Sequence, residues 1–331
     1  MNVLFYGFRH VHLRDYYTKA VNHPDYRIVA ALEEDPHYRK LAEDHQGVVF
    51  SEGTYEQWLE NPDVEVVAIG TAYGDRGPAV IKALQHGKHV LSDKPICTNL
   101  EELEEIRALA TEKHLKVGCL LDLKYTPSIL PAKELLDSGR MGKVKNITFN
   151  GQHCIDYANR PSWYFEPGMH GGTINDIAIH GIDIIPYLTG QKITKLHAAR
   201  TWNSFATRHP HFMDCAVFMA ETDGGAGVQA DVSYAAPSQV FSMPTYWSFQ
   251  IWCERGLVTF CAVNHDVTVY EEGIKEPQII SGKDHPIDML TEFVREWQSE
   301  EAVMTQRVLE STQTALLIQK AADEAKGATN L

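Results

Sequence analysis

Strand and helix patterns alternate along about the first 120 residues, and this alternation constrains the fold more than any other feature of the chain. Short apolar segments rich in β-branched residues predict strands at 2–7, 27–33, 64–71, 88–93 and 116–121. Segments with helical periodicity separate them, at 11–22, 36–46, 54–60, 76–86 and 99–114. Strands that alternate with helices form a parallel sheet covered on both faces. We therefore expect a doubly wound α/β domain over residues 1–122.

The remainder of the chain has a different pattern. A helix near 127–138 precedes a long strand at 143–155, and a loop at 158–172 leads into a helix at 173–188. From 192 to 271 the pattern is strand and turn almost throughout, and residues 285–324 return to helix. One helix followed by many strands is typical of an open, mainly antiparallel sheet. We expect an α+β domain for substrate binding and oligomerisation over residues 123–331.

Composition excludes several classes of partner. The chain has 30 basic and 44 acidic residues, for a net charge of −14, which argues against a nucleic-acid partner. It lacks an apolar run of about 18 residues, so no membrane span is expected. Its first strand is too short for a signal peptide, and its six scattered cysteines favour a reduced, cytoplasmic protein.

The turn after the first strand is the place where a dinucleotide-binding fold puts its glycines. Here the sequence is Gly7-Phe8-Arg9-His10-Val11-His12, which keeps only the first glycine of G-x-G-x-x-G. Gly7 permits a tight turn, and the Arg9 side chain can pair with a phosphate. A Rossmann-type cofactor site and an ordinary strand-to-helix turn are both consistent with this segment.

The same turn raises the question of a metal. His10 and His12 form an H-x-H pair, but no carboxylate or cysteine lies close to them in the sequence. Two histidines without a third ligand are weak support for a metal site. We therefore predict no bound metal.

The second strand ends in the acidic run Glu33-Glu34-Asp35. A carboxylate at this place accepts hydrogen bonds from the ribose hydroxyls of NAD and repels the 2′-phosphate of NADP. Glu33 therefore favours NAD over NADP. The alternative is a solvated acidic loop.

A lysine follows the strand at 88–93, in Ser92-Asp93-Lys94-Pro95. The carboxyl end of a parallel strand faces the crevice where ligands bind, so Lys94 is a candidate for contact with a substrate hydroxyl. Its ammonium group could stabilise an alkoxide that develops there. Pro95 restricts the backbone, and the Lys94–Pro95 bond is a candidate for the cis form.

The helix expected at 173–188 carries polar residues in one line. Asp176 and His180 are four residues apart, and Asp183 follows three residues later, among mostly apolar neighbours. Buried polar groups are costly unless they are paired or bind a ligand. A histidine beside a carboxylate has the form of an oriented general base, although a paired Asp–His in the core is the alternative.

Together these motifs resemble the glucose–fructose oxidoreductase, inositol dehydrogenase and MocA (Gfo/Idh/MocA) family over nearly the whole chain. The stretch GKHVLSDKP (87–95) is similar to that family's G-K-H-V-x-x-E-K-P, and GGTINDIAIHGID (171–183) to its G-G-x-x-x-D-x-x-x-H-x-x-D. The chain departs from the family at the glycine turn, at Asp93 in place of Glu, and at TAYGDR (71–76) in place of T-P-x-x-x-H. The resemblance implies Lys94, Asp176 and His180 as the catalytic residues. It also implies NAD contacts from Gly7, Phe8, Arg9, His10, Glu33, Thr71, Ala72, Tyr73, Asp93, Lys94 and Pro95.

The resemblance implies an NAD(P)-dependent dehydrogenase that acts on a CH–OH group of a sugar, polyol or derivative. His180 would take the hydroxyl proton, Asp176 would orient His180, and Lys94 would stabilise the alkoxide. We expect substrate contacts from Asp176 and His180 and from candidates in the segment 153–170, namely His153, Tyr157, Arg160, Trp163, Tyr164 and His170. An epimerase, lyase or glycosidase that oxidises its substrate transiently, and a sugar or nucleotide sensor without turnover, are the alternatives.

The strands at 212–263 predict an assembly. Several are apolar on both faces, as in YWSFQIWC (246–253), and an open sheet with helices on one side leaves its other side exposed. Pairing of that side with a second copy would cover it. We expect a homodimer or homotetramer, with Trp247, Phe249, Ile251 or the residues between them at or near the contact.

Overall fold

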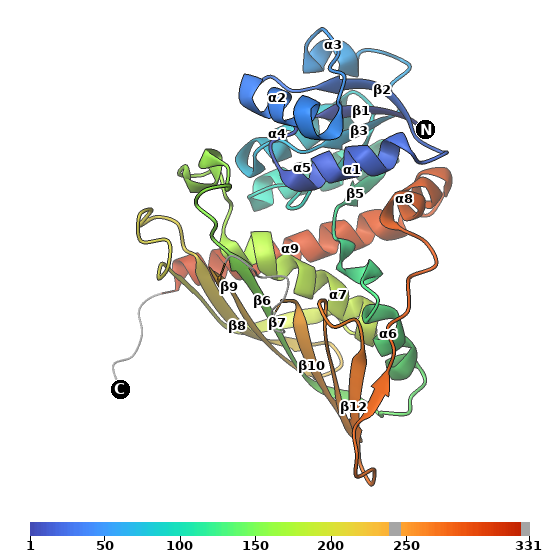
Figure 1. Ribbon diagram of the computed structural model, residues 1–331, viewed down its shortest axis with the longest axis vertical. Coiled ribbons are helices and arrows are strands. Elements are labelled where there is room, and N and C mark those ends of the chain that lie inside the picture. The colour runs from blue at the N-terminus through green and yellow to red at the C-terminus, as the bar shows by residue number, and fades with distance from the viewer. Residues whose placement is uncertain (238–245, 326–331) are drawn as a thin grey trace. The chain divides into compact units, whose positions relative to one another are not determined.

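A computed structural model describes residues 1–237 and 246–325, which form two compact units (Figure 1). The first unit consists of residues 1–120, 161–171 and 287–313, and the second of 121–160, 172–286 and the described residues from 314 onward. Two segments from the second half of the chain therefore belong to the first unit. The domain division at residue 122 stays a prediction.

The first unit contains a five-stranded parallel sheet in the order β2-β1-β3-β4-β5, which confirms the predicted doubly wound domain. The strands are β1 (Asn2–Tyr6), β2 (Arg27–Leu32), β3 (Val66–Ile69), β4 (His89–Ser92) and β5 (Val117–Cys119). Strand order reverses direction at β1, so right-handed crossovers place the helices on both faces of the sheet.

Several helices of this unit begin at a residue whose side chain caps them. The helices of the unit are α1 (Val11–Val21), α2 (Pro36–Gln46), α3 (Tyr55–Leu59), α4 (Tyr73–Gln85), α5 (Leu100–Glu112), α8 (Met289–Gln298) and the first part of α9 (Val303–Glu324). Asp35 caps α2 and Asn99 caps α5 through their side chains. α4 begins three residues earlier than we predicted, because Tyr73, Gly74 and Asp75 form its first turn. α1 has no side-chain cap.

The carboxyl ends of β1 and β3 meet where the strand order reverses. Gly7 has a φ of +76°, and a Cβ atom there would lie 2.6 Å from Cγ2 and 2.8 Å from the backbone nitrogen of Thr71. Only glycine fits this close approach. Ligands of open α/β sheets bind at such a reversal point, outside the carboxyl ends of the strands.

The second unit contains an eight-stranded sheet in the order β13-β12-β11-β10-β6-β9-β8-β7. The strands are β6 (Val144–Cys154), β7 (Ile193–Trp202), β8 (Cys215–Thr222), β9 (Gly227–Ala236), β10 (Ser248–Cys253), β11 (Gly256–Cys261), β12 (Val267–Glu271) and β13 (Gln278–Ile280). The sheet is mainly antiparallel, as predicted, but β6 and β9 run parallel. A long connection with a helix and two strands separates them in the sequence, which is the kind of crossover that parallel pairing requires.

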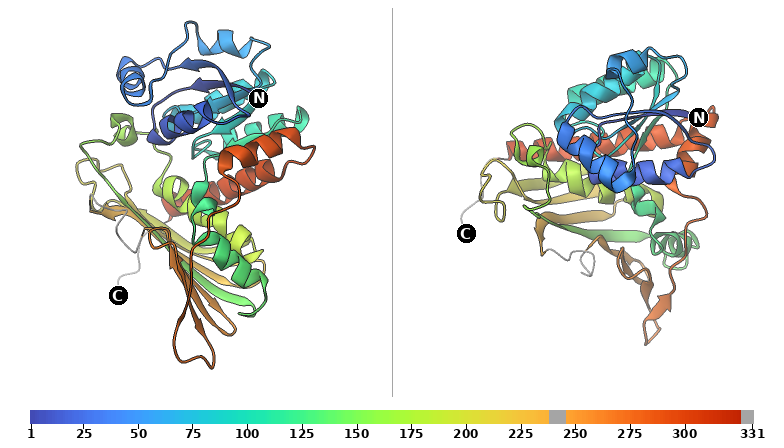
Figure 2. Two further views of the ribbon diagram at one scale, coloured as in Figure 1. Left: turned by 45° about the vertical axis from the view of Figure 1, so that its right-hand side comes forward. Right: turned by 45° about the horizontal axis from the view of Figure 1, so that its top comes forward.

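The helices of the second unit lie along one face of this sheet (Figure 2). They are α6 (Ile129–Asp137), α7 (Ile179–Thr189) and the second part of α9. The helix that we predicted over 173–188 is not uniform, because Ile174–Ala178 form a π-helical turn before α7 begins. Single π turns inside helices are frequent at functional sites.

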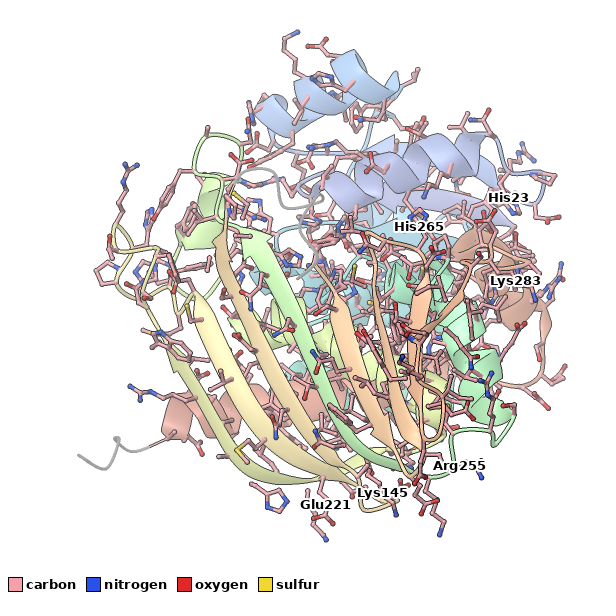
Figure 3. All side chains as sticks on the ribbon, turned by 60° about the horizontal axis from the view of Figure 1, so that its bottom comes forward. His23, Lys145, Glu221, Arg255, His265 and Lys283 are labelled. Atoms are coloured by element: carbon pink, nitrogen blue, oxygen red, sulfur yellow. The ribbon has the colours of Figure 1, made fainter. Side chains whose placement is uncertain are left out.

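Among the residues that the structure describes, no helix lies in front of the opposite face of the eight-stranded sheet (Figure 3). Alternate residues of β8 point to this side, and Met219 is 53% exposed. Of the residues that we predicted at or near the assembly contact, Trp247, Phe249 and Ile251 are buried in the chain's own core, and the contact itself stays a prediction. Gln250 and Trp252, which alternate with them on β10, are exposed instead. Ser248 and Gln250 are polar and alternate with these three buried residues, so local periodicity does indicate which side of the strand faces the core.

The structure also bears on the expectations about membrane spans and cysteines. No helix in the described part of the chain is both long and apolar enough to cross a bilayer. All six cysteines are free, and all but Cys154 are buried, as expected for small apolar core residues.

Candidate active site

Lys94 lies in the loop that follows β4, and its side chain is buried, with only 3% of the residue exposed. The Lys94–Pro95 bond is cis, as we had considered. Lys94 Nζ donates to the Tyr73 hydroxyl at 3.4 Å and lies 5.6 Å from the centre of the Tyr73 ring. A buried ammonium needs polar partners, and this hydroxyl is one of them.

Arg76 holds this loop in place, and the sequence analysis missed it. Its side chain is fully buried, and it donates to the carbonyls of Thr71 (2.6 Å) and Pro95 (3.1 Å) and to that of Lys94. It occupies the position of the histidine in the family's T-P-x-x-x-H. That replacement was the available sequence signal, but burial of an arginine cannot be read from it.

Tyr73 is the centre of an aromatic cluster in the first unit. Its hydroxyl lies 2.7 Å from the Tyr164 hydroxyl and 3.3 Å from Nε2 of His10. The rings of Trp163 and His170 lie 4.9 and 5.9 Å from the Tyr73 ring, centre to centre. Trp163, Tyr164 and His170, which we predicted as substrate residues, are thus grouped around a residue that we predicted as a cofactor contact.

Asp93 pairs with both histidines of the first turn. Its Oδ2 lies 2.8 Å from Nδ1 of His10, and its Oδ1 lies 3.1 Å from Nδ1 of His12. Burial lowers the pKa of His10 to about 3, so its ring is neutral at physiological pH. Burial alone would raise the pKa of Asp93, but the histidines and the Arg76 guanidinium outweigh burial and hold it well below its usual range. We predicted no metal because His10 and His12 had no evident carboxylate partner in the sequence. The structure provides one, since the Asp93 carboxylate contacts both histidines.

Glu33 holds the turn after β1 through hydrogen bonds to its backbone and to Arg9. Its carboxylate accepts from the backbone nitrogens of Phe8 (2.6 Å) and Asp35 (2.8 Å) and from Nε of Arg9 (2.8 Å). Arg9 also lies 3.6 Å from the carboxylate of Asp35 and 5.2 Å from the centre of the Tyr38 ring. The predicted ribose contact of Glu33 stays a prediction, and it requires Arg9 to share or leave this carboxylate.

The first turn also has features that fit a dinucleotide. The N-terminus of α1 carries no side-chain cap, so its backbone N–H groups can meet an anion. The Thr71 hydroxyl is buried and has no hydrogen-bond partner among the residues that the structure describes. Phe8 and Ala72 are buried, and the Phe8 backbone nitrogen already donates to Glu33, so the predicted NAD contacts of both residues stay predictions. An uncapped helix and an orphaned hydroxyl beside Gly7 are the groups that a pyrophosphate would satisfy.

In the second unit, Asp176 lies in the π-helical turn and is almost fully buried. Its Oδ2 accepts a short hydrogen bond from the hydroxyl of Tyr234, which projects from β9. The sequence analysis missed Tyr234, although a tyrosine at an inward position of a strand is a signal for a buried polar partner. The predicted orientation of His180 by Asp176 stays a prediction.

Aromatic rings surround His180 and the predicted substrate residues of β6 and the loop after it. The rings of His180 and His153 lie 4.9 and 5.3 Å from the Trp247 ring, and the Arg160 guanidinium lies 5.4 Å from the centre of the Tyr234 ring. The centre of the Tyr157 ring lies 6.0 Å from that of the His209 ring and 4.8 Å from the Arg208 guanidinium. The predicted loop residues therefore divide between the units: His153, Tyr157 and Arg160 belong to the second, and Trp163, Tyr164 and His170 to the first.

Comparison with known families agrees with this geometry. Residues 1–120 match the model for the oxidoreductase family with the NAD-binding Rossmann fold, and residues 129–259 match the GFO/IDH/MocA C-terminal domain. The chain belongs to the Gfo/Idh/MocA oxidoreductase family, and its N-terminal domain is an NAD-binding Rossmann domain.

Individual relatives are more distant. A levoglucosan dehydrogenase of Pseudarthrobacter phenanthrenivorans is 27% identical over 54% of this chain and 46% of its own length. A scyllo-inositol 2-dehydrogenase (NAD(+)) of Bacillus subtilis is 30% identical over 57% of this chain and 54% of its own. The chain thus matches about half the length of these curated relatives. The crystal structure of an oxidoreductase from Erwinia carotovora atroseptica has the same fold, with a TM-score of 0.87 and 22% identity over 97% of this chain and 98% of its own.

Proposed function

We propose that the protein is an NAD-dependent dehydrogenase that transfers a hydride between nicotinamide and a hydroxyl-bearing carbon of a sugar, polyol or derivative. The observation that carries the proposal is Lys94, a buried lysine at the carboxyl end of a parallel strand in an NAD-binding Rossmann domain. The names of the relatives, which are dehydrogenases of levoglucosan and scyllo-inositol, support the substrate class.

The proposed roles follow from the chemistry of each side chain. The Lys94 ammonium donates to the substrate hydroxyl and stabilises the alkoxide that forms as the proton leaves. His180 accepts that proton, since an imidazole is the side chain best suited to proton transfer near neutral pH. Asp176, held by the Tyr234 hydroxyl, orients His180 or a neighbouring hydroxyl of the substrate.

NAD, when bound, supplies the hydride acceptor and donor of the reaction. The α1 N-terminus, the Thr71 hydroxyl and the Arg9 side chain would hold its phosphates, and Glu33 would face its ribose and disfavour NADP. The backbone of Gly7, Phe8, His10 and Ala72 and the residues Tyr73, Asp93, Lys94 and Pro95 complete the proposed cofactor site.

The predicted substrate residues of both units suit a sugar or polyol ring, which has apolar faces and a polar rim. Trp163 and Tyr164 offer aromatic surface with polar edges, and His153 and Arg160 offer hydrogen-bond donors. We propose that His153, Tyr157, Arg160, Trp163, Tyr164 and His170 select the substrate together with Asp176 and His180.

We also propose that the protein works in the cytoplasm as a homodimer or a dimer of dimers. The exposed face of the eight-stranded sheet supports the assembly, because Val217, Met219 and Trp252 are exposed there. A hollow of about 410 Å³ on β7, β8 and β9 adds mostly apolar surface to the same face. Free, mostly buried cysteines support a reducing compartment.

The test begins with the nucleotide that co-purifies. Mass spectrometry of small molecules released from the denatured protein should detect NAD, and a panel of sugars and polyols should then be screened for NADH formation. Detection of NADP alone would contradict the cofactor proposal. Exchange of solvent deuterium into a substrate without net NADH would contradict net dehydrogenation and indicate transient oxidation.

A further inference from the structure

His10, His12 and Asp93 bring three metal-binding groups together in the first unit. One ring nitrogen of each histidine and a carboxylate oxygen of Asp93 all lie within 4.8 Å of one another. His10 is the residue before α1 and His12 lies in its first turn, whereas Asp93 follows β4, more than 80 residues away. Two imidazoles and one carboxylate are a ligand set for divalent transition metals.

The ligand atoms face one another at short range. Nδ1 of His10 lies 2.8 Å from Oδ2 of Asp93, and Nδ1 of His12 lies 3.1 Å from Oδ1. His10 and Asp93 are buried, so solvent does not reach two of the three groups.

The surroundings would hold the ligands in place. The other ring nitrogen of His10, Nε2, lies 3.3 Å from the Tyr73 hydroxyl, and a metal-bound histidine commonly donates its second N–H to an oxygen. A hydroxyl can both donate and accept, so Tyr73 accommodates either tautomer of His10. The backbone nitrogen of Lys94 donates to Asp93 Oδ1 at 2.7 Å, which orients the carboxylate.

Two neighbouring positive charges oppose a cation, the Arg76 guanidinium and the Lys94 ammonium, whose Nζ lies 3.4 Å from the same Tyr73 hydroxyl that contacts His10. Nη2 of Arg76 lies 3.6 Å from Asp93 Oδ2, on a guanidinium that also binds three backbone carbonyls. Because these carbonyls share the arginine's positive charge, Asp93 keeps the ability to bind on the side of the histidines. The His12 side chain is 40% exposed, so the open side of the cluster lies next to His12.

We propose that His10, His12 and Asp93 bind one divalent transition-metal ion, of the class that contains Zn²⁺ and Co²⁺. Three protein ligands leave coordination positions for water or for an oxygen of a ligand, as in catalytic rather than structural metal sites. The proposal concerns this unit alone and does not depend on NAD binding or on a dehydrogenase reaction.

The experiment uses the full-length protein without an affinity tag, stripped of metal with a chelator and dialysed. Calorimetric titration with Zn²⁺ should show one ion per chain, and Co²⁺ should give the visible absorption of a low-symmetry complex with nitrogen and oxygen ligands. His12→Ala should weaken Zn²⁺ binding by more than about tenfold, since a ligand contributes at least as much as the groups that orient it. Asp93→Asn should have the same effect if the variant folds.

His45→Ala is the matched control, because His45 is exposed on α2 in the same unit and lies outside the cluster. It should bind Zn²⁺ as the wild type does. His12 is partly exposed, so its replacement tests the site without removing a core residue. Absence of Zn²⁺ binding at micromolar concentration, or equal affinity in His12→Ala and the wild type, would overturn the proposal and leave a hydrogen-bonded cluster only.

Discussion

Replacement of Glu33 by glutamine separates the two roles that this carboxylate could have. Its two oxygens are committed to different partners: Oε2 accepts from Phe8 N, and Oε1 accepts from Asp35 N and from Nε of Arg9. A glutamine has one accepting oxygen, so its NH₂ group must face one of the two backbone N–H groups. The turn that carries the proposed cofactor contacts would therefore lose a buried hydrogen bond.

The expected cost follows from these contacts. One buried N–H left without a partner costs about 1–3 kcal/mol. Loss of the partly exposed ion pair with Arg9 adds about 0.5–1 kcal/mol. We expect Glu33→Gln to lower the free energy of unfolding by about 1.5–4 kcal/mol in urea denaturation, with an unchanged dependence on urea concentration.

Glu34→Gln is the control, because Glu34 is exposed and only reaches the Tyr6 hydroxyl at 3.4 Å. It should stay within about 0.5 kcal/mol of the wild type. A Glu33→Gln variant as stable as this control would refute the reasoning about the turn. Titration of both dinucleotides gives a second reading: if Glu33 also repels a 2′-phosphate, the variant should bind NADP more tightly relative to NAD than the wild type does.

Three further outcomes are expected. Lys94→Ala and His180→Ala should each lower kcat by about 10²–10⁴-fold on an identified substrate, with circular dichroism unchanged in both and NAD binding unchanged in His180→Ala. Tyr234→Phe should destabilise the protein by about 1.5–3 kcal/mol in urea denaturation, since it removes a buried hydrogen bond to the Asp176 carboxylate without leaving a cavity. Met219→Glu should reduce the mass measured by light scattering toward the 37.3 kDa of one chain, because it places a charge on the exposed face of the eight-stranded sheet.

Each of these expectations has a result that would contradict it. Near wild-type kcat in both the Lys94 and His180 variants would show that the catalytic assignment is wrong. Stability of Tyr234→Phe equal to wild type would show that the hydroxyl contributes nothing to the fold. Val49→Glu, a change at an exposed apolar residue of the first unit, should leave the assembled mass unchanged. A wild-type protein that is monomeric at micromolar concentration would rule out the dimer.

The sequence by itself determined the elements and the order in which they occur. Alternating apolar strands and helices predicted the five-stranded parallel sheet, because the periodicity of buried residues is a local property. The placement of Gly7 after β1 and of Lys94 after β4 followed from the same pattern, since the ends of parallel strands meet at one edge. Asp176 was correctly expected to be buried, because apolar residues surround it in the chain.

Only the tertiary structure decided which side chains meet. Asp93 pairs with His10 across 83 positions, and Tyr73 meets Tyr164 across 91. Contacts at such separations depend on the register of neighbouring strands and on the path of a loop, and neither leaves a trace in local periodicity. Local sequence encodes burial and secondary structure, whereas packing of distant segments creates the chemistry of the site.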